Sequence, residues 1–175
     1  MLLRPNDEPD LWGSLFAECE RSAFHLETLD AYAVASESEP LRRFLDGEPA
    51  DTSWFDPWRA VLADATGRGV SVRRVRVVTQ PLTDYHRWLL TLTPENITAG
   101  EDIRYLPRHL AGEVPTEDFW LFDDSRVAFH ARDARNRGLA MVVTTDPGLV
   151  RYCVQTRDQL WPSATAFDEY AGSLR

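Results

Sequence analysis

The stretch that most constrains the fold of this chain is residues 117–124, which read EDFWLFDD. Four large apolar residues, at positions 119–122, lie between two acidic pairs. A short continuous apolar run bounded by charge predicts a strand that is buried on both faces of a sheet. A second apolar run follows at residues 127–130 after only a few turn residues, so the sequence predicts a strand, a tight turn and another strand.

Size and hydrophobicity predict one compact domain. With 175 residues, 43% of them hydrophobic and 11% aromatic, the chain can bury a substantial core. No stretch approaches the roughly 20 apolar residues of a membrane span, and the early acidic residues do not fit a signal peptide, so we expect a cytoplasmic protein with no membrane partner. Cys19 and Cys153 lack metal or redox spacing, and two buried free thiols are expected.

The charge pattern excludes several classes of mechanism. The formal net charge is −9, and all 19 basic side chains are arginines. Without lysine there can be no Schiff-base lysine, no P-loop lysine and no phospholipase-type lysine. The negative balance also argues against direct binding to duplex DNA, which requires neutralisation of phosphates. A local face of arginines could still bind one phosphate.

Hydrophobic periodicity and turn residues predict an α/β domain with a mixed sheet flanked by helices. We expect an N-terminal helical extension over residues 1–50 and an α/β core over residues 51–175. The expected helices cover residues 7–21, 37–45, 56–67, 83–92, 148–161 and 165–174. The expected strands cover residues 22–29, as a short edge strand, and residues 70–78, 102–106, 119–122, 127–130 and 138–145.

The order of motifs between residues 56 and 164 resembles the single-copy half-domains of the phospholipase D-like superfamily. These motifs are GRGV followed by a valine-rich strand, GEDIR, FWLFDD with RVA, and DPGLVR. The resemblance implies a phospholipase D-like fold, in which an HxKxxxxD motif carries the chemistry. Its positions are occupied here by Thr116, Asp118 and Asp123. Only the last aspartate is retained, so the resemblance implies a pseudoenzyme.

A second resemblance covers nearly the whole chain. The segments SAFHLETLDAY at 22–32, RVRVVTQPLTDYHRW at 74–88, AGEDIRYL at 99–106 and DFWLFDD at 118–124 are similar to an actinobacterial family of uncharacterised domains. Members of that family are often encoded beside helix-turn-helix regulators. The similarity therefore implies a protein partner of that kind.

Several polar residues are candidates for an anion or ligand cleft. Asp84, Tyr85 and Arg87 follow the strand at 70–78, where open α/β sheets bind ligands, although Asp84 also fits a helix N-cap. The other candidates are His109, the best-placed histidine for a phosphate, together with Asp118 and Asp123. The histidines lack metal-binding spacing, so we expect no metal, no cofactor and no assignable catalytic residue.

Trp54 and Phe55 are candidates for binding a partner. They precede the expected helix at 56–67, in a loop rather than in a periodic apolar stretch. An exposed aromatic pair would be a hydrophobic anchor, whereas a buried pair would cap the core. The sequence leaves both interpretations open.

Three functions compete at this stage. The first is a non-enzymatic regulatory or protein-interaction module, which fits the missing motif residues and the acidic charge. The second is a divergent phosphodiesterase or nuclease that would use Asp123 with arginines and a histidine. The third is a small-ligand sensor that uses the retained cleft. A homodimer is also possible, because catalytic phospholipase D-like domains pair two half-sites.

Overall fold

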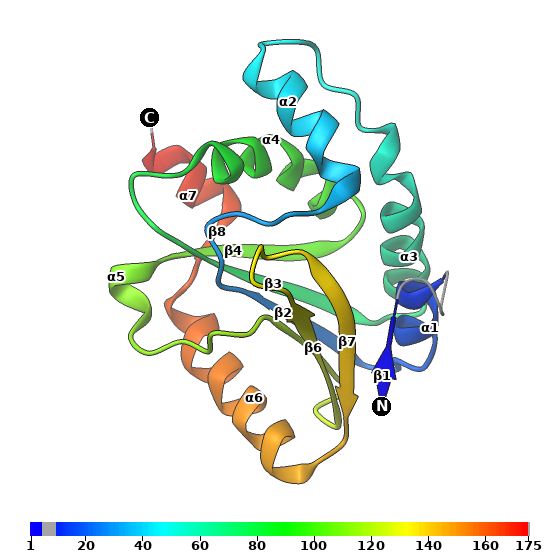
Figure 1. The fold of residues 1–175 in the computed structure, drawn as a ribbon. Coiled ribbons are helices and arrows are strands. Elements are labelled where there is room, and N and C mark those ends of the chain that lie inside the picture. Colours follow the sequence, from blue (N-terminus) through cyan, green and yellow to red (C-terminus); the bar gives the residue numbers. More distant parts are fainter. Residues whose placement is uncertain (5–9, 175) are drawn as a thin grey trace.

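The computed structural model describes residues 1–4 and 10–174, which form an eight-stranded sheet with helices on both faces (Figure 1). The strand order across the sheet is β1-β7-β6-β5-β2-β3-β4-β8. The strands are β1 (Leu2–Leu3), β2 (Ser22–Glu27), β3 (Ser71–Val78), β4 (Glu101–Pro107), β5 (Phe119–Phe122), β6 (Arg126–Arg132), β7 (Gly138–Thr144) and β8 (Thr165–Ala166). The helices are α1 (Leu11–Ala17), α2 (Ser38–Leu45), α3 (Asp56–Gly67), α4 (Asp84–Thr98), α5 (Arg108–Ala111), α6 (Pro147–Leu160) and α7 (Phe167–Ser173).

The apolar run at residues 119–122 is a central strand, as predicted. All four residues of β5 are buried, and β5 pairs antiparallel with β2 on one side and with β6 on the other. The turn between β5 and β6 places Asp123 and Asp124 at φ values of 53° and 56°. Aspartate tolerates this left-handed conformation better than most residues do, which suits it to a tight turn. Strands β5, β6 and β7 form an antiparallel meander.

Strands β2, β3 and β4 form the parallel part of the sheet. Their carboxyl ends lie at one edge, followed by the loop after β2, the β3–α4 connection and α5. Parallel strands need crossover connections, and α3 and α4 provide them. This mixed α/β architecture with helices on both faces confirms the predicted fold class.

The two faces of the sheet are covered by separate cores. One face packs against α1 and α3, with Phe16, Leu62, Trp120 and Phe122 in one buried cluster. The opposite face packs against α6, whose Cys153 lies in a second buried cluster with residues of β2, β3 and β5. Strands β2, β3, β5 and β6 contribute residues to both clusters, because the pleat turns successive side chains to opposite faces.

The structure corrects the predicted role of the N-terminal region. The strand at 22–29 was expected at an edge, but β2 lies between β5 and β3 in the middle of the sheet. Residues 1–50 contain α1 and α2, but β2 between them is an integral part of the core, so this region is not an extension separate from the sheet. The helix expected at 7–21 is observed over Leu11–Ala17, and residues 7–9 of that prediction lie outside the described residues.

Two further expectations can be compared with the structure. In the described part of the chain, no helix combines the length and hydrophobicity needed to cross a bilayer. Cys19 and Cys153 are both buried free thiols, as predicted. Burial raises the pKa of Cys19 to about 11 and that of Cys153 to about 12, so both are protonated thiols at neutral pH.

Candidate functional site

Asp118, which stands at the lysine position of the motif, is a buried structural carboxylate. Its Oδ1 accepts hydrogen bonds from the backbone N–H of Thr28 (2.8 Å) and from the Thr28 hydroxyl (2.9 Å), so it ties β5 to the end of β2. Burial raises the pKa of Asp118, although the hydrogen bonds from Tyr32 and Thr28 act to lower it. Arg132 Nη2 lies 3.9 Å from Oδ2. The carboxylate therefore holds a loop in place instead of facing an open cleft.

Asp123, the retained motif aspartate, also has a structural role. Its two side-chain oxygens accept hydrogen bonds from the backbone N–H groups of Glu20 (2.9 Å), Arg21 (2.8 Å) and Ser22 (2.9 Å). Burial acts to raise its pKa, but these N–H donors outweigh burial and hold the pKa below the usual value. Asp123 thus caps the start of β2. Because β5 separates it from Asp118, the two carboxylates lie at opposite ends of one strand.

The third motif position, Thr116, is exposed, and its hydroxyl donates to Glu117 at 3.2 Å. Two histidines lie near Asp118 on neighbouring strands: His25 is stacked on Trp120 at 4.3 Å between ring centroids and on His130 at 5.4 Å. Burial lowers the pKa of both imidazoles, that of His130 to about 3, so both are neutral at pH 7. Neither ring nitrogen of His25 has a hydrogen-bond partner among the described residues.

The remaining predicted cleft residues lie on the helices that follow β3 and β4. Asp84 and Arg87 form an ion pair on the exposed side of α4. The N-cap of α4 is Thr83 and not Asp84, and the Thr83 hydroxyl accepts from His86 N at 3.2 Å. Tyr85 is buried. His109 is exposed on the short helix α5. The six predicted residues therefore do not form one cleft. Three of them lie on α4, one lies on α5, and Asp118 and Asp123 lie at opposite ends of β5.

The carboxyl edge of the parallel strands holds a polar cluster that sequence reasoning missed. Asp30 accepts hydrogen bonds from the backbone N–H (3.2 Å) and hydroxyl (2.8 Å) of Thr79, and Arg108 Nε donates to the same hydroxyl at 3.1 Å. His86 Nδ1, which is buried and without a hydrogen-bond partner in the described chain, lies 4.0 Å from Asp30. The sequence did offer one indication of this cluster, because Thr79 directly follows β3 and Arg108 directly follows β4.

A buried ion-pair layer crosses the sheet beneath α4. Glu27 on β2 binds both Arg74 and Arg76 of β3, and Arg74 Nε donates to Glu101 at 2.6 Å. The hydroxyls of Thr93 and Tyr105 each accept from Arg76 at 2.9 Å. Arginine suits this position because its planar guanidinium binds two carboxylates and remains charged when buried. With each guanidinium paired to a carboxylate, the layer is a structural network.

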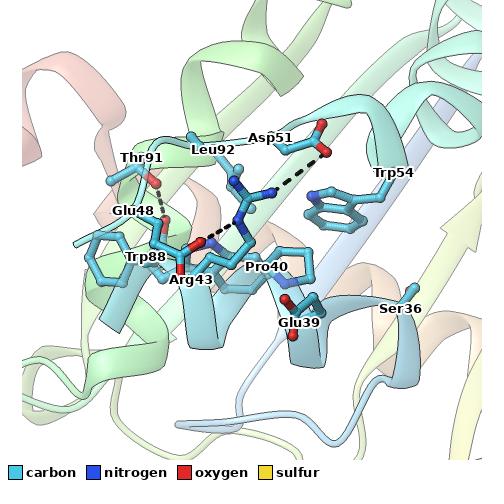
Figure 2. A pocket seen from close by; sticks show the side chains of 12 residues that line it. Ser36, Glu39, Pro40, Arg43, Glu48, Asp51, Trp54, Trp88, Thr91 and Leu92 are labelled. Carbon is cyan, nitrogen blue, oxygen red and sulfur yellow. Dashed lines mark hydrogen bonds and ion pairs between the residues drawn. The ribbon is translucent and has the colours of Figure 1, made fainter. Parts of the chain in front are cut away.

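A pocket of about 250 Å³ lies between α2, the loop after it, and α4 (Figure 2). Its walls include Trp54, Trp88, Phe44 and Leu92, and the ring centroids of the two tryptophans lie 5.8 Å apart at an interplanar angle of 23°. Figure 1 shows α2 on the outer side of α4, away from the sheet. This pocket therefore lies outside the phospholipase D-like core.

The aromatic pair at 54–55 divides between the two interpretations that the sequence left open. Phe55 is 8% exposed and belongs to the interior, so the expectation of an exposed anchor is wrong for this residue. Trp54 is half-buried and lines the pocket, where its indole Nε1–H has no hydrogen-bond partner among the described residues. Among the described residues, no group of three or more histidine, cysteine, aspartate or glutamate side chains is placed to hold a metal ion.

Solved structures share this fold at low sequence identity. Nuc from Salmonella typhimurium, a phospholipase D family member, is 12% identical and aligns over 95% of both chains with a TM-score of 0.58. NucT from Helicobacter pylori is 11% identical and aligns over 95% of this chain and 96% of its own, with a TM-score of 0.53. These similarities show the phospholipase D-like fold alone.

TrmBL2, described as an archaeal chromatin protein with a novel mode of DNA binding, is 13% identical with a TM-score of 0.53. The alignment covers 94% of this chain and 52% of TrmBL2, so the chain spans about half the length of that protein. A search of curated proteins finds no match to the chain. The family model called Domain of unknown function (DUF6879) matches residues 10–172, and the chain therefore belongs to the DUF6879 family.

Proposed function

We propose that this protein is a non-enzymatic regulatory module that binds another protein, specifically a helix-turn-helix transcriptional regulator. The observation that supports the proposal is that the two aspartates at the motif positions have structural roles. Asp123 caps β2 through three backbone N–H groups, and Asp118 is buried against Thr28. A phospholipase D-like reaction needs a nucleophilic histidine, and Thr116 at the corresponding position has no imidazole.

Charge supports a basic protein partner over DNA. The chain carries an excess of nine negative charges, which repels a phosphate backbone and attracts a basic DNA-binding protein. The arginines pair locally with acids, as Asp84 does with Arg87 and Asp102 does with Arg104 at 3.7 Å. Such pairs leave little free positive potential for phosphate.

The relation to TrmBL2 is consistent with this role. TrmBL2, which is described as binding DNA, contains a region of this fold that makes up about half of its length. We propose that the acidic domain acts on a DNA-binding protein encoded near it. A homodimer is compatible with this role, and measuring the molar mass in solution would establish it.

A paired measurement tests the proposal. The purified protein is titrated by fluorescence anisotropy against labelled duplex DNA and against the candidate regulator, at the same moderate salt concentration. We expect binding to the regulator and none to DNA alone. Tight binding to DNA by itself, or no binding to any helix-turn-helix regulator encoded beside it, would contradict the proposal.

Catalysis is tested separately with a generic phosphodiester substrate, for which we expect no turnover above the blank. Robust turnover that disappears in Asp123→Ala, in a variant that remains folded, would support the divergent phosphodiesterase instead. Saturable binding of a small anion with no regulator binding would favour the ligand sensor.

A further inference from the structure

The pocket between α2 and α4 has a size that suits one side chain. Its volume of about 250 Å³ lies below the range of roughly 300–1,000 Å³ that is typical of small-molecule sites. The aromatic walls belong to a satellite cluster around Trp88 and Leu92, in which Phe44 and Trp54 are only partly buried. An apolar side chain entering the pocket would bury the remaining exposed surface of these rings.

The pocket also contains an unused donor. Trp54 Nε1 makes no hydrogen bond within the described residues and is itself buried, so the indole has to rotate before an entering group can reach this nitrogen. Figure 2 shows the indole nitrogen on the side of the ring that faces Arg43, toward the interior of the pocket. A buried indole N–H usually finds a partner, and a main-chain carbonyl of an entering segment would supply an acceptor.

Charges around the pocket favour a basic occupant. Glu39, Glu48 and Asp51 line the pocket together with Arg43. Arg42 binds Glu39 at 2.7 Å and also pairs with Asp46, so four carboxylates and two guanidiniums leave two negative charges in excess. Arg43 is already engaged, because its Nε lies 3.0 Å from Glu48 and its Nη1 lies 3.8 Å from Asp51. The Glu39 side chain is 66% exposed although it pairs with Arg42. An acidic segment would therefore be repelled.

We propose that this pocket is the docking site for a basic segment of the partner protein, which inserts one large apolar side chain between Trp54 and Phe44 and places flanking arginines or lysines beside Glu39 and Glu48. The inserted residue packs against the rings, and its main-chain carbonyl accepts from Trp54 Nε1–H. This inference rests on the proposed function and specifies where and by what chemistry the partner binds.

The probe is a short synthetic peptide with one leucine between arginines. It is titrated into ¹⁵N-labelled protein while the indole N–H signals of the tryptophans are followed by NMR, with the Trp54 signal assigned by its loss in Trp54→Phe. We expect a saturable shift of the Trp54 and Trp88 signals. The same peptide with serine in place of leucine, or glutamates in place of arginines, should bind at least tenfold more weakly.

Variants separate the contributions of the hydrogen bond, the charge and the shape of the pocket. Trp54→Phe keeps an aromatic ring but removes the donor, and should weaken binding about fivefold. Glu39→Gln combined with Glu48→Gln should weaken it about threefold or more, with a reduced salt dependence. Thr91→Trp, at an exposed position of α4 that lines the pocket, should block binding without disturbing the core.

The matched control is Glu113→Gln combined with Glu169→Gln, which makes the same change in net charge at exposed positions outside the pocket and should leave the affinity unchanged. An unshifted Trp54 signal, equal binding of the acidic peptide, or undiminished binding in Thr91→Trp would overturn the inference.

The full regulator distinguishes this inference from the proposed function. If the regulator binds wild type and Thr91→Trp with equal affinity, the pocket inference fails while the proposed function stands. If the regulator binds neither protein, the proposed function fails, whatever the peptide does. Regulator binding that is lost in Thr91→Trp and retained in the matched control would support both.

Discussion

Replacing Glu27 with glutamine tests whether the buried ion-pair layer stabilises the fold. The Glu27 carboxylate is 9% exposed and binds Arg74 through one oxygen and Arg76 through the other. Glutamine has nearly the same shape but no charge. Arg74 would keep Glu101 at 2.6 Å, whereas Arg76 would retain only the neutral hydroxyls of Thr93 and Tyr105.

The expected cost follows from the charge that is left behind. Breaking a buried ion pair by removing one partner costs about 3–5 kcal/mol, because the remaining charge is buried without compensation. Since Arg76 keeps two hydrogen bonds, we expect the lower end, about 3 kcal/mol. In a domain of this size each kcal/mol lowers Tm by about 2–4 °C, so Glu27→Gln should unfold about 10 °C below wild type.

The pH dependence provides an independent check of the mechanism. Burial alone would raise the pKa of Glu27, but the guanidinium groups of Arg74 and Arg76 outweigh it and hold the pKa well below the usual 4.5. A depressed pKa in the folded state gives stability that is present above pH 4.5 and is lost as the pH falls below it. The stability difference between wild type and Glu27→Gln should therefore narrow below pH 4.5 by about 1.4 kcal/mol per pH unit.

Urea unfolding followed by tryptophan fluorescence at pH 7 and at pH 3.5 measures both effects. Glu113→Gln, at an exposed position, is the control and should change stability by no more than about 0.5 kcal/mol. If Glu27→Gln loses less than about 1 kcal/mol at pH 7, or if its deficit is the same at both pH values, the argument from an uncompensated guanidinium is refuted.

Three further changes test the roles of individual residues. Asp123→Asn should lower stability by about 1–3 kcal/mol in denaturant unfolding, because the charged acceptor of three backbone N–H groups is lost; an unchanged midpoint would contradict the capping role. Gly100→Ala should destabilise by about 1–3 kcal/mol, since Gly100 has a φ of +99° and a Cβ there would lie 2.8 Å from a threonine of α3, whereas Gly67→Ala meets no atom within 4 Å and should be near neutral. Cys19 and Cys153, whose raised pKa values are about 11 and 12, should react with a thiol reagent at pH 8 far more slowly in the native protein than in urea, and rapid native labelling would contradict their burial.

The sequence predicted those elements whose burial can be recognised from their own pattern of apolar residues. Strand β5 was predicted from four consecutive apolar side chains, and the turn after it from its acidic residues. Strand β2 was placed at an edge because polar residues alternate with Phe24 and Leu26, a pattern that is typical of a half-exposed strand. The structure buries those polar residues, since Glu27 meets arginines of β3 and His25 stacks on Trp120. A partner on another strand cannot be read from local periodicity.

The candidate site shows the same limit. Asp118 was assigned to a cleft from its position in a motif, yet its hydrogen-bond partner Thr28 lies 90 residues away in the sequence. The ion pair between Asp84 and Arg87 is local by contrast, because both residues lie on one helix, three positions apart. The tryptophan pair of the pocket joins residues 54 and 88, and its existence depends on how α2 and its loop pack on α4.

Burial leaves the negative charge of this protein on its surface. Among the described residues, the buried cations are Arg74, Arg76 and Arg157, and the buried carboxylates are Glu27, Glu101 and Asp118. The two sets cancel, so the interior removes none of the acidic excess. Asp118 ties β5 to the end of β2 in the core, and the unmatched carboxylates remain outside, where they would attract a basic partner of the kind proposed above. The acidic composition and the loss of the motif are thus consistent with one role, a scaffold that presents a charged surface.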